Sequence, residues 1–158
     1  MAVDTAATQQ ILQLIPQQSP FRFIDAIAEV DSHRIVGTYR FRDDEYFYRG
    51  HFPNRPITPG VILIETMAQT GVVAFGIYLL LQEDISPDHI RHMVTLFATV
   101  DEVEFSSIVM PGETVTIRGE KVYFRRGTIK TRVSIEKQDG EIACYGILTG
   151  RGVTINET

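Results

Sequence analysis

Cysteine is almost absent from this chain of 158 residues, which contains only Cys144. A single cysteine cannot form an internal disulfide, and this is typical of a protein that folds in a reducing compartment. The first ten residues, MAVDTAATQQ, also lack a basic cluster and a long apolar run. We therefore expect no secretory signal peptide, and we expect a cytoplasmic protein.

The chain also has no excess of basic residues. Its 15 Lys and Arg residues stand against 20 Asp and Glu residues, for a net charge of -5, which disfavours nucleic acid as a partner. The basic residues that do occur are concentrated in residues 118–132, where Glu120 is the single acid. They are Arg118, Lys121, Arg125, Arg126, Lys130 and Arg132. Either these side chains cover the solvated faces of two strands, or they form a docking patch for an acidic partner.

A long uninterrupted apolar run is missing as well. The most apolar segment, residues 59–82, is compatible with a helix from Pro59 onwards, because proline suits the first turn. It is hydrophobic nearly all round, so we expect it to be buried on most sides. Glu65 and Gln69 interrupt its first half, and the apolar part that remains is too short for a hydrocarbon core of about 30 Å. The segment therefore predicts a buried central helix and no membrane span.

The rest of the chain predicts a second helix and several strands within a single domain, 1–158. The helix lies in residues 1–16, where Asp4 or Thr5 could cap it and Pro16 ends it. We expect strands at 21–28, 35–41, 93–103, 114–124, 128–137 and 141–153, with turns at Asp31-Ser32-His33, Met110-Pro111-Gly112, Arg126-Gly127 and Asp139-Gly140. Since strands and helices do not alternate, the expected fold class is α+β, with an antiparallel sheet wrapped around the central helix.

Glu65 is an unusual residue in the central helix, because Val61, Ile64 and Ala68 around it are apolar. Burial among such side chains disfavours the charged carboxylate and raises its pKa. Gln69 lies four residues further on, on the same face of the helix, and could donate a hydrogen bond that orients the carboxyl group. The alternative is a purely structural Glu65 that reaches a basic partner or the edge of the helix.

His51 stands in the loop YRGHFPNRPITPG (48–60), in which three prolines restrict the backbone. A histidine in a loop is usually without a special role, but rigid loops on a scaffold often hold functional groups. His89 and His92, preceded by Asp88, have the spacing of a metal pair. Without a cysteine or a convincing third ligand nearby, we expect no metal site.

The start of the central helix supplies a third chemical element. The backbone amides of Gly60 and Val61 have no partner inside the helix and point the positive end of its dipole at a developing oxyanion. Glycine also allows a substrate to approach the backbone closely. A neutral base, a carboxyl with a raised pKa and an oxyanion site suit proton abstraction next to a carbonyl, followed by loss of a leaving group. The expected site consists of the catalytic His51 and Glu65 and the substrate-binding Gly60, Val61, Gln69, Phe52 and Pro59.

Three segments of the chain carry a resemblance to a known family. Residues 50–69, GHFPNRPITPGVILIETMAQ, match every fixed position of the pattern G-H-F-P-x-x-P-I-x-P-G-V-x-x-x-E-x-x-A-Q. Residues 15–25, IPQQSPFRFID, are similar to an L-P-H-R-x-P-F-x-x-x-D segment, and residues 110–115, MPGETV, to a V-x-P-G-D turn. These patterns are those of the (3R)-hydroxyacyl-[acyl-carrier-protein] dehydratases, the hot-dog-fold enzymes of type II fatty acid synthesis.

The resemblance implies a role for each site residue. His51 is expected to be the catalytic base, Glu65 the catalytic acid, and Gly60 the source of the amide that holds the thioester oxygen. Members of the family are dimers, often trimers of dimers, and each active site is built across two subunits. They need no metal and no organic cofactor beyond the phosphopantetheine arm of the acyl carrier protein, which is the expected partner. Enzymes of polyketide or polyene pathways share the same features.

The chain departs from the family pattern at two places. Gln17 and Gln18 replace a His-Arg pair, and Thr58 stands where the family usually has methionine or another apolar residue. Neither change touches the acid or the base, but both could alter the substrate tunnel or carrier recognition.

Three other functions remain open at this point: a hot-dog thioesterase, a dehydratase-isomerase, and a non-catalytic acyl-binding or regulatory hot-dog protein. Isomerases of the family typically carry aspartate at the acid position, so Glu65 argues against that branch. Regulators add a DNA-binding segment, for which residues 1–20 are too short.

Overall fold

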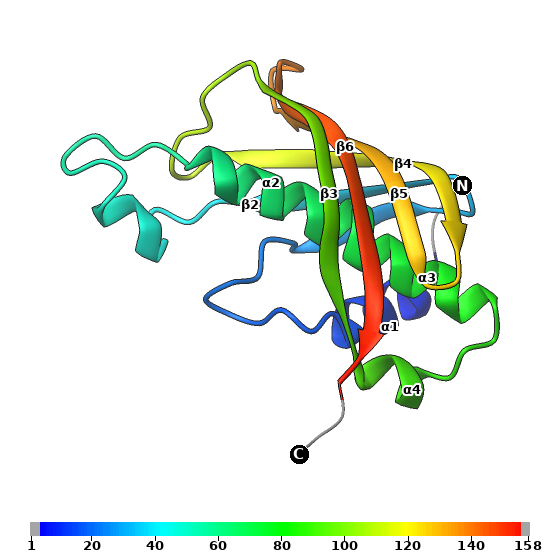
Figure 1. Ribbon diagram of the computed structural model, residues 1–158. Coiled ribbons are helices and arrows are strands. Elements are labelled where there is room, and N and C mark those ends of the chain that lie inside the picture. Colours follow the sequence, from blue (N-terminus) through cyan, green and yellow to red (C-terminus); the bar gives the residue numbers. More distant parts are fainter. Residues whose placement is uncertain (1–3, 156–158) are drawn as a thin grey trace.

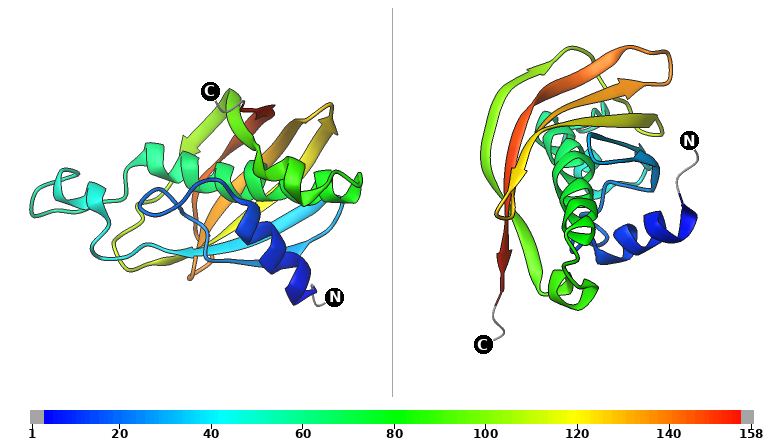
Figure 2. Two further views of the ribbon diagram at one scale, coloured as in Figure 1. Left: turned by 90° about the horizontal axis from the view of Figure 1, so that it is seen from below. Right: turned by 90° about the vertical axis from the view of Figure 1, so that its right-hand side faces the viewer.

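The computed structural model describes residues 4–155, and its sheet curls around one long helix (Figures 1 and 2). The sheet has six antiparallel strands in the order β1-β2-β4-β5-β6-β3. The strands are β1 (Ala26–Val30), β2 (Arg34–Arg40), β3 (Met93–Phe105), β4 (Thr114–Arg125), β5 (Thr128–Lys137) and β6 (Ile142–Thr154). The helices are α1 (Thr5–Leu14), the 3-10 turn η1 (Tyr46–Arg49), α2 (Gly60–Ala68), the π-helical η2 (Gln69–Ala74), α3 (Phe75–Gln82) and α4 (Pro87–Arg91). The α+β class and the sheet around a central helix are confirmed.

The amino-terminal helix α1 follows the expected pattern within the described residues. The Asp4 side chain accepts a hydrogen bond from the backbone N–H of Ala6, as an N-cap does. Ile11, Leu12 and Leu14 are buried, and the chain leaves the helix at Ile15, directly before Pro16. The part of the prediction that concerns residues 1–3 lies outside the described residues.

The central helix consists of α2, η2 and α3 in direct succession. Pro59 is its N-cap residue rather than its first helical residue, and the Pro59 carbonyl accepts hydrogen bonds from the N–H groups of Ile62 and Leu63. The helix from Gly60 to Gln82 is long and apolar enough to cross a membrane, but 72% of its most apolar window is buried inside the protein. The core helix of a soluble protein meets the same criteria, so this helix is weak evidence for a membrane span.

Two glycines allow the sheet to approach the central helix closely. A Cβ atom on Gly119 of β4 would lie 3.1 Å from the Cα atom of Gly71. A Cβ atom on Gly71 would in turn lie 2.6 Å from a methyl group of Val133 on β5. Any larger side chain would push the sheet away from the helix, because such distances are shorter than a normal packing contact.

The first expected strand is wrong in its position. It was expected at 21–28, but β1 begins at Ala26. The N–H of Phe23 and the carbonyl of Phe21 bond to the side chain of Gln69 in the central helix, and the N–H of Phe21 donates to the carbonyl of Gln18 in a turn. The apolar run at 21–24 therefore belongs to an irregular segment that is packed on the helix.

The short elements η1 and α4 were not expected. Helix α4 has a proline at its first position, and its preceding Ser86 accepts a hydrogen bond from the N–H of His89. Five residues are too few to show a helical hydrophobic period, so the sequence pattern gave no indication of it. Helices α1 and α4 pack against α3, at the end of the central helix that is far from η1 (Figure 1).

Candidate active site

The loop that contains His51 is held by its own backbone. The N–H of Ile57 donates to the carbonyl of His51 at 2.9 Å, and Phe52 and Arg55 exchange two backbone hydrogen bonds. The N–H of Thr58 donates to the carbonyl of Val109 at 3.0 Å, which joins the loop to the segment before β4. The loop is therefore restrained by backbone hydrogen bonds as well as by its prolines, in agreement with the expected rigid loop.

The imidazole ring of His51 has a defined tautomer. Its Nδ1 atom lies 2.9 Å from the carbonyl oxygen of Ile57. A carbonyl oxygen can only accept a hydrogen bond, so Nδ1 must carry the hydrogen. In the neutral ring the lone pair then lies on Nε2, which is the atom that can take up a proton. The ring also stacks on Phe52, with a centroid distance of 4.1 Å.

Thr58 anchors the other end of this loop. Its hydroxyl lies 2.7 Å from the hydroxyl of Tyr48, and both side chains are buried. Burial raises the pKa of Tyr48 to about 12, so the phenol is neutral at ordinary pH. The threonine that departs from the family pattern is thus the hydrogen-bond partner of a buried tyrosine. The other departure, Gln17 and Gln18, follows α1, and Gln18 donates to the carbonyl of Ile15.

Glu65 lies in α2 and is partly buried. Its carboxyl oxygen Oε1 accepts a hydrogen bond of 2.9 Å from Nε2 of Gln69, as expected from the spacing of four residues. Burial raises the pKa of Glu65 and outweighs the opposite effect of the hydrogen bond from Gln69. A carboxyl group with a raised pKa is suited to hold and donate a proton.

The first turn of α2 presents backbone amides next to this loop. The N–H groups of Gly60 and Val61 have no partner within the helix, because the first helical residues lack a carbonyl four positions earlier. A Cβ atom on Gly60 would lie 2.9 Å from a ring carbon of Phe105. A larger residue at this position would have to displace the ring of Phe105, so glycine suits the close packing of this ring on the start of α2. Val61 is 72% exposed.

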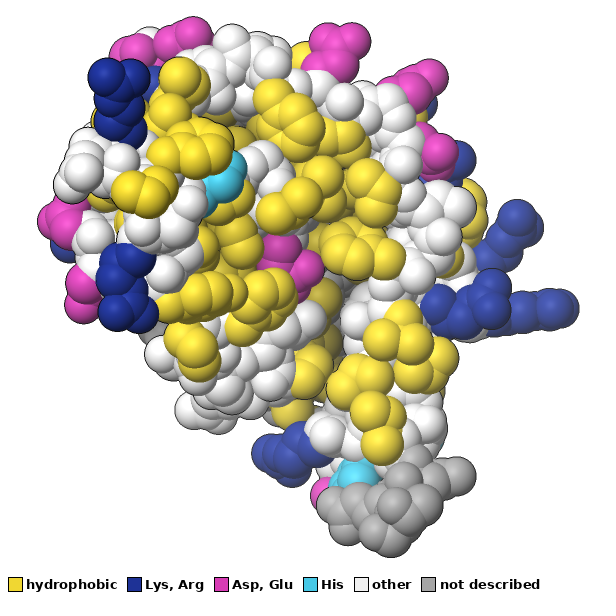
Figure 3. All heavy atoms as spheres, turned by 60° about the vertical axis from the view of Figure 1, so that its left-hand side comes forward, with side chains coloured by type: hydrophobic (Ala, Val, Ile, Leu, Met, Phe, Trp, Pro, Cys, Tyr) yellow, Lys and Arg dark blue, Asp and Glu magenta, His cyan; other side chains and the backbone are white. Residues whose placement is uncertain are grey.

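The acid and the base are not joined within this chain. Among the hydrogen bonds and ion pairs of residues 4–155, the His51 ring has Ile57 as its partner and the Glu65 carboxyl has Gln69. Hydrophobic side chains gather around a histidine and an acidic group on the face drawn in Figure 3. The exposed large hydrophobic residues near the start of α2 and along β3 are Phe52, Val61, Leu96, Phe97, Val100, Phe105, Ile108 and Met110.

The six basic residues expected to form one docking patch are divided by the structure. Arg118 is ion-paired with Glu136 at 3.0 Å, and it lines a groove on the outer face of the sheet together with Arg132 and three glutamates. Those glutamates are Glu102, Glu104 and Glu120.

A second, open depression lies at the hairpin between β4 and β5. It is lined by Tyr123, Arg125, Arg126, Thr128 and Arg151, with no acidic residue in the lining. Arg151 lies on β6 opposite Thr128, and its distance in sequence explains why the pattern of residues 118–132 did not include it. Lys121 and Lys130 are partly exposed and line neither surface.

The remaining candidates for chemistry do not form sites. Among residues 4–155, no group of three or more His, Cys, Asp and Glu side chains could hold a metal ion. His92 uses its Nδ1 atom to bond the carbonyl of Asp88. Cys144 is buried, which raises the pKa of its thiol to about 11 and disfavours the nucleophilic thiolate.

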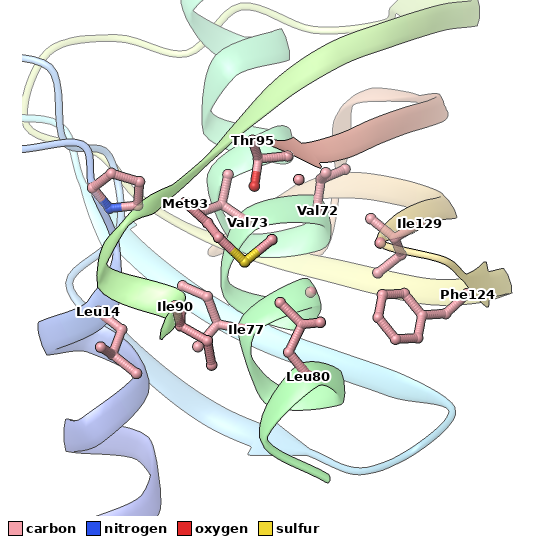
Figure 4. Close-up of a pocket in the computed structure, with 14 residues that line it drawn as sticks. Leu14, Val72, Val73, Ile77, Leu80, Ile90, Met93, Thr95, Phe124 and Ile129 are labelled. Carbon is pink, nitrogen blue, oxygen red and sulfur yellow. The ribbon is translucent and has the colours of Figure 1, made fainter. Parts of the chain in front are cut away.

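An apolar cavity lies beneath the second half of the central helix (Figure 4). Leu80 and Ile77 of α3 face Ile90, Met93 and other apolar side chains across it. Its volume of about 30 Å³ corresponds to roughly one water-sized group. The cavity is therefore a small packing gap and not a pocket that could hold an acyl chain.

Comparison with known sequences points to one family. Residues 15–146 match the FabA-like domain. The chain is 36% identical over 140 residues to the 3-hydroxyacyl-[acyl-carrier-protein] dehydratase FabZ of Caldicellulosiruptor bescii, which covers 88% of this chain and 93% of that protein. It is 36% identical over 143 residues to the enzyme of the same name from Bacillus subtilis, with 90% and 94% of the two chains covered.

Solved structures show the same fold. The dehydratase heterocomplex ApeI:P from Xenorhabdus doucetiae superposes with a TM-score of 0.75 at 14% identity, over 93% of this chain and 91% of the other. A hypothetical thioesterase from Streptococcus pneumoniae, crystallised with coenzyme A, gives a TM-score of 0.54 at 16% identity, over 83% and 87% of the two chains. At such low identity these similarities support the hot-dog fold and not a particular activity.

Proposed function

The chain belongs to the FabA-like domain family, and from this we propose that it removes water from a (3R)-3-hydroxyacyl-[acyl-carrier-protein] to give the trans-2-enoyl product. The observation that carries the proposal is the complementary state of its two reactive side chains. His51 has its Nδ1 atom occupied and Nε2 free as a base. Glu65 has a raised pKa that favours the protonated acid. Dehydration needs one group of each kind.

The proposed reaction uses each group once. Nε2 of His51 takes the proton from C2 of the acyl chain, and the electrons of that C–H bond form the double bond between C2 and C3. The C3–O bond breaks as Glu65 gives its proton to the leaving hydroxyl, which departs as water. The amide of Gly60 donates to the thioester oxygen, where negative charge develops. Afterwards His51 is protonated and Glu65 ionised, and a proton must pass between them to restore the site.

A characteristic pH dependence follows from these roles. The reaction requires the lone pair on Nε2 of His51, which is the base. It also requires protonated Glu65, so activity falls at high pH as the carboxyl ionises. Burial raises the pKa of Glu65, and this moves the high-pH limb upwards.

Product analysis tests this function. The protein is incubated with 3-hydroxyacyl carrier proteins of several chain lengths, and the products are identified by mass and by the position of the double bond. We expect a trans-2-enoyl carrier protein. Release of the free acid would identify a thioesterase, a shifted double bond would identify an isomerase, and binding without conversion would identify a non-catalytic acyl-binding protein.

We further propose that the active site is shared between two copies of the chain, as the family resemblance implies. Strand β3 is one of the two edge strands of the sheet, and most of its residues are exposed. Hydrophobic side chains also surround the start of α2. An unpaired edge next to an apolar face is suited to a second copy, which would bring its His51 to the Glu65 of the first copy. Dimers of this kind could assemble further into trimers of dimers.

Complementation of two inactive variants tests the shared site. His51→Ala and Glu65→Ala are mixed in equal amounts under conditions that exchange subunits, and exchange is verified by mass. Half of the dimers are then mixed, and each mixed dimer has one intact site of two, so about a quarter of wild-type activity should return. If both residues of a site came from one chain, no activity would return.

The acidic acyl carrier protein is the proposed partner, and the depression lined by Arg125, Arg126 and Arg151 is the proposed docking surface. The absence of acids from this lining supports it over the groove at Arg118 and Arg132, where glutamates offset the positive charge. The two side chains His51 and Glu65 supply both proton transfers. We therefore propose that no metal and no organic cofactor takes part beyond the phosphopantetheine arm of the carrier. The proposed location is the cytoplasm, in fatty acid synthesis or a related polyketide or polyene pathway.

A further inference from the structure

Gln69 is a fully buried polar residue at the junction of α2 and the π-helical segment, with an exposed fraction of 0%. Its side-chain oxygen accepts a hydrogen bond of 2.6 Å from the backbone N–H of Phe23. Its side-chain nitrogen donates to the carbonyl of Phe21 at 2.9 Å and to Oε1 of Glu65 at 2.9 Å. Gln69 thus links the segment 21–23, which is 46 to 48 residues away in sequence, to the acid of the active site.

The backbone of Phe21 and Phe23 fixes the orientation of the Gln69 amide. The N–H of Phe23 can only donate and the carbonyl of Phe21 can only accept. If the amide were rotated by half a turn, its nitrogen would face the N–H and its oxygen would face the carbonyl, so two buried hydrogen bonds would be lost. The orientation is therefore determined by the backbone and not by Glu65.

This fixed amide distinguishes the two oxygens of Glu65. One N–H of the Gln69 amide is used by Phe21, and the other must point at Oε1 of Glu65. Oε1 therefore acts as the acceptor, as the carbonyl oxygen of a protonated carboxyl group does, and the proton belongs on the other oxygen. We propose that Gln69 is a positioning residue that makes Oε2 of Glu65 the oxygen that carries and delivers the proton. The proposal rests on the dehydratase function proposed above.

The same hydrogen bond also limits how strongly Glu65 holds its proton. A donor to a carboxylate favours the charged form, so the hydrogen bond from Gln69 lowers the pKa of Glu65 while burial raises it. Loss of the donor should leave burial unopposed and raise the pKa of Glu65 further. The high-pH limb of the activity profile would then move to higher pH, which a purely structural role of Gln69 does not predict.

The first experiment compares Gln69→Met with a matched control. Methionine is similar in length but makes none of the three hydrogen bonds. The control, Arg22→Met, removes the hydrogen bond of 2.7 Å from Arg22 to the carbonyl of Leu12, which holds the same segment, and leaves Glu65 untouched. Both variants should lower the Tm. In Gln69→Met, kcat should also fall about tenfold or more with a small change in KM, because misplacing a reacting group is costly, and the high-pH limb should move upwards. In Arg22→Met the limb should stay in place.

The proposal would be overturned if Gln69→Met lost stability while its kcat and its pH profile matched those of the Arg22→Met control. Gln69 would then only hold the segment 21–23 in place.

A second experiment does not depend on turnover or on the folding of a variant. In the wild-type protein, NMR follows the side-chain carboxyl carbon of Glu65 and the side-chain amide of Gln69 during a pH titration. Both signals should shift with one common midpoint, and the shift of the amide should vanish in Glu65→Gln. Independent behaviour of the two signals would contradict the contact. If the protein proved inactive on every hydroxyacyl carrier protein, the proposed function would fail, and this titration would still decide whether Gln69 controls the carboxyl group.

Discussion

The base and the acid of the site are held in place by different means. His51 is oriented by a carbonyl only six residues away, inside a loop that closes on itself through its own backbone. Glu65 is oriented by Gln69, whose amide is fixed by the backbone of residues 46 to 48 positions earlier in the chain. The geometry of the base is therefore largely local, whereas the geometry of the acid depends on how the amino-terminal segment packs on the central helix.

This difference separates the effects that damage to each region should have. Changes in the loop should impair the base and leave the titration of Glu65 unchanged. Changes around Gln69 should alter the acid and leave the loop intact. Two predictions test this separation, beginning with the one that has the largest effect, and a third concerns a surface outside both regions.

Replacing the acid itself should have the largest effect. Glu65→Gln preserves the shape of the side chain but has no proton to transfer, so kcat should fall by about 10² or more. Single-turnover assays with a 3-hydroxyacyl carrier protein measure this loss of rate. The variant His51→Gln, which lacks the base instead of the acid, is measured in the same assay for comparison. Nearly normal turnover of Glu65→Gln would contradict the assignment of the acid.

A smaller effect is expected when the anchor of the loop is removed. Thr58→Val leaves the hydroxyl of Tyr48 buried without a partner, which should lower the free energy of unfolding by about 1–3 kcal/mol. Because the loop that carries His51 ends at this anchor, kcat should also fall by roughly tenfold. The NMR titration of Glu65 should be the same as in the wild type.

The double variant Tyr48→Phe, Thr58→Val supplies the control for this anchor. It removes both hydroxyl groups, so no buried polar group is left without a partner. Chemical denaturation should show it to be more stable than Thr58→Val alone. Equal stability of the two variants would mean that the hydrogen bond between the hydroxyl groups contributes little.

The smallest effect is expected outside both regions. Reversing Arg125 and Arg126 to Glu should raise KM for a carrier-bound substrate several-fold and weaken the salt dependence of this KM, while kcat stays unchanged. A short thioester surrogate without the carrier should be little affected. Arg118→Glu is the matched control, since Arg118 is paired with Glu136 in the other groove. If the carrier-bound and the short substrate responded equally, the depression at the hairpin would be a structural feature only.

Most strand boundaries and all four turns could be predicted from local patterns. Hairpins with Arg126-Gly127 and Asp139-Gly140 lie where the sequence places them, between β4 and β5 and between β5 and β6. Such turns need a residue with a positive φ angle, and Gly127 and Gly140 both have one. The strand expected at 21–28 was misplaced because its apolar residues fit a strand as well as they fit a segment packed on a helix.

The sequence by itself determined the identity of the two reactive groups and the local geometry of one of them. The motif of residues 50–69 contains both His51 and Glu65, and the loop around His51 closes with hydrogen bonds between neighbours in sequence. The apolar residues next to Glu65 were sufficient to predict that its pKa is raised, because a helix that is hydrophobic nearly all round is expected to be buried.

Only the tertiary structure decided which oxygen of Glu65 meets a donor, which basic residues line one surface, and which side chain bonds the hydroxyl of Thr58. Gln69 meets residues 21–23, Arg151 joins Arg125 and Arg126, and Thr58 meets Tyr48 through contacts between separate elements. A hydrogen bond or a charged surface depends on distances of a few ångströms. The packing of the helix in the sheet sets these distances, and no pattern of neighbouring residues records them.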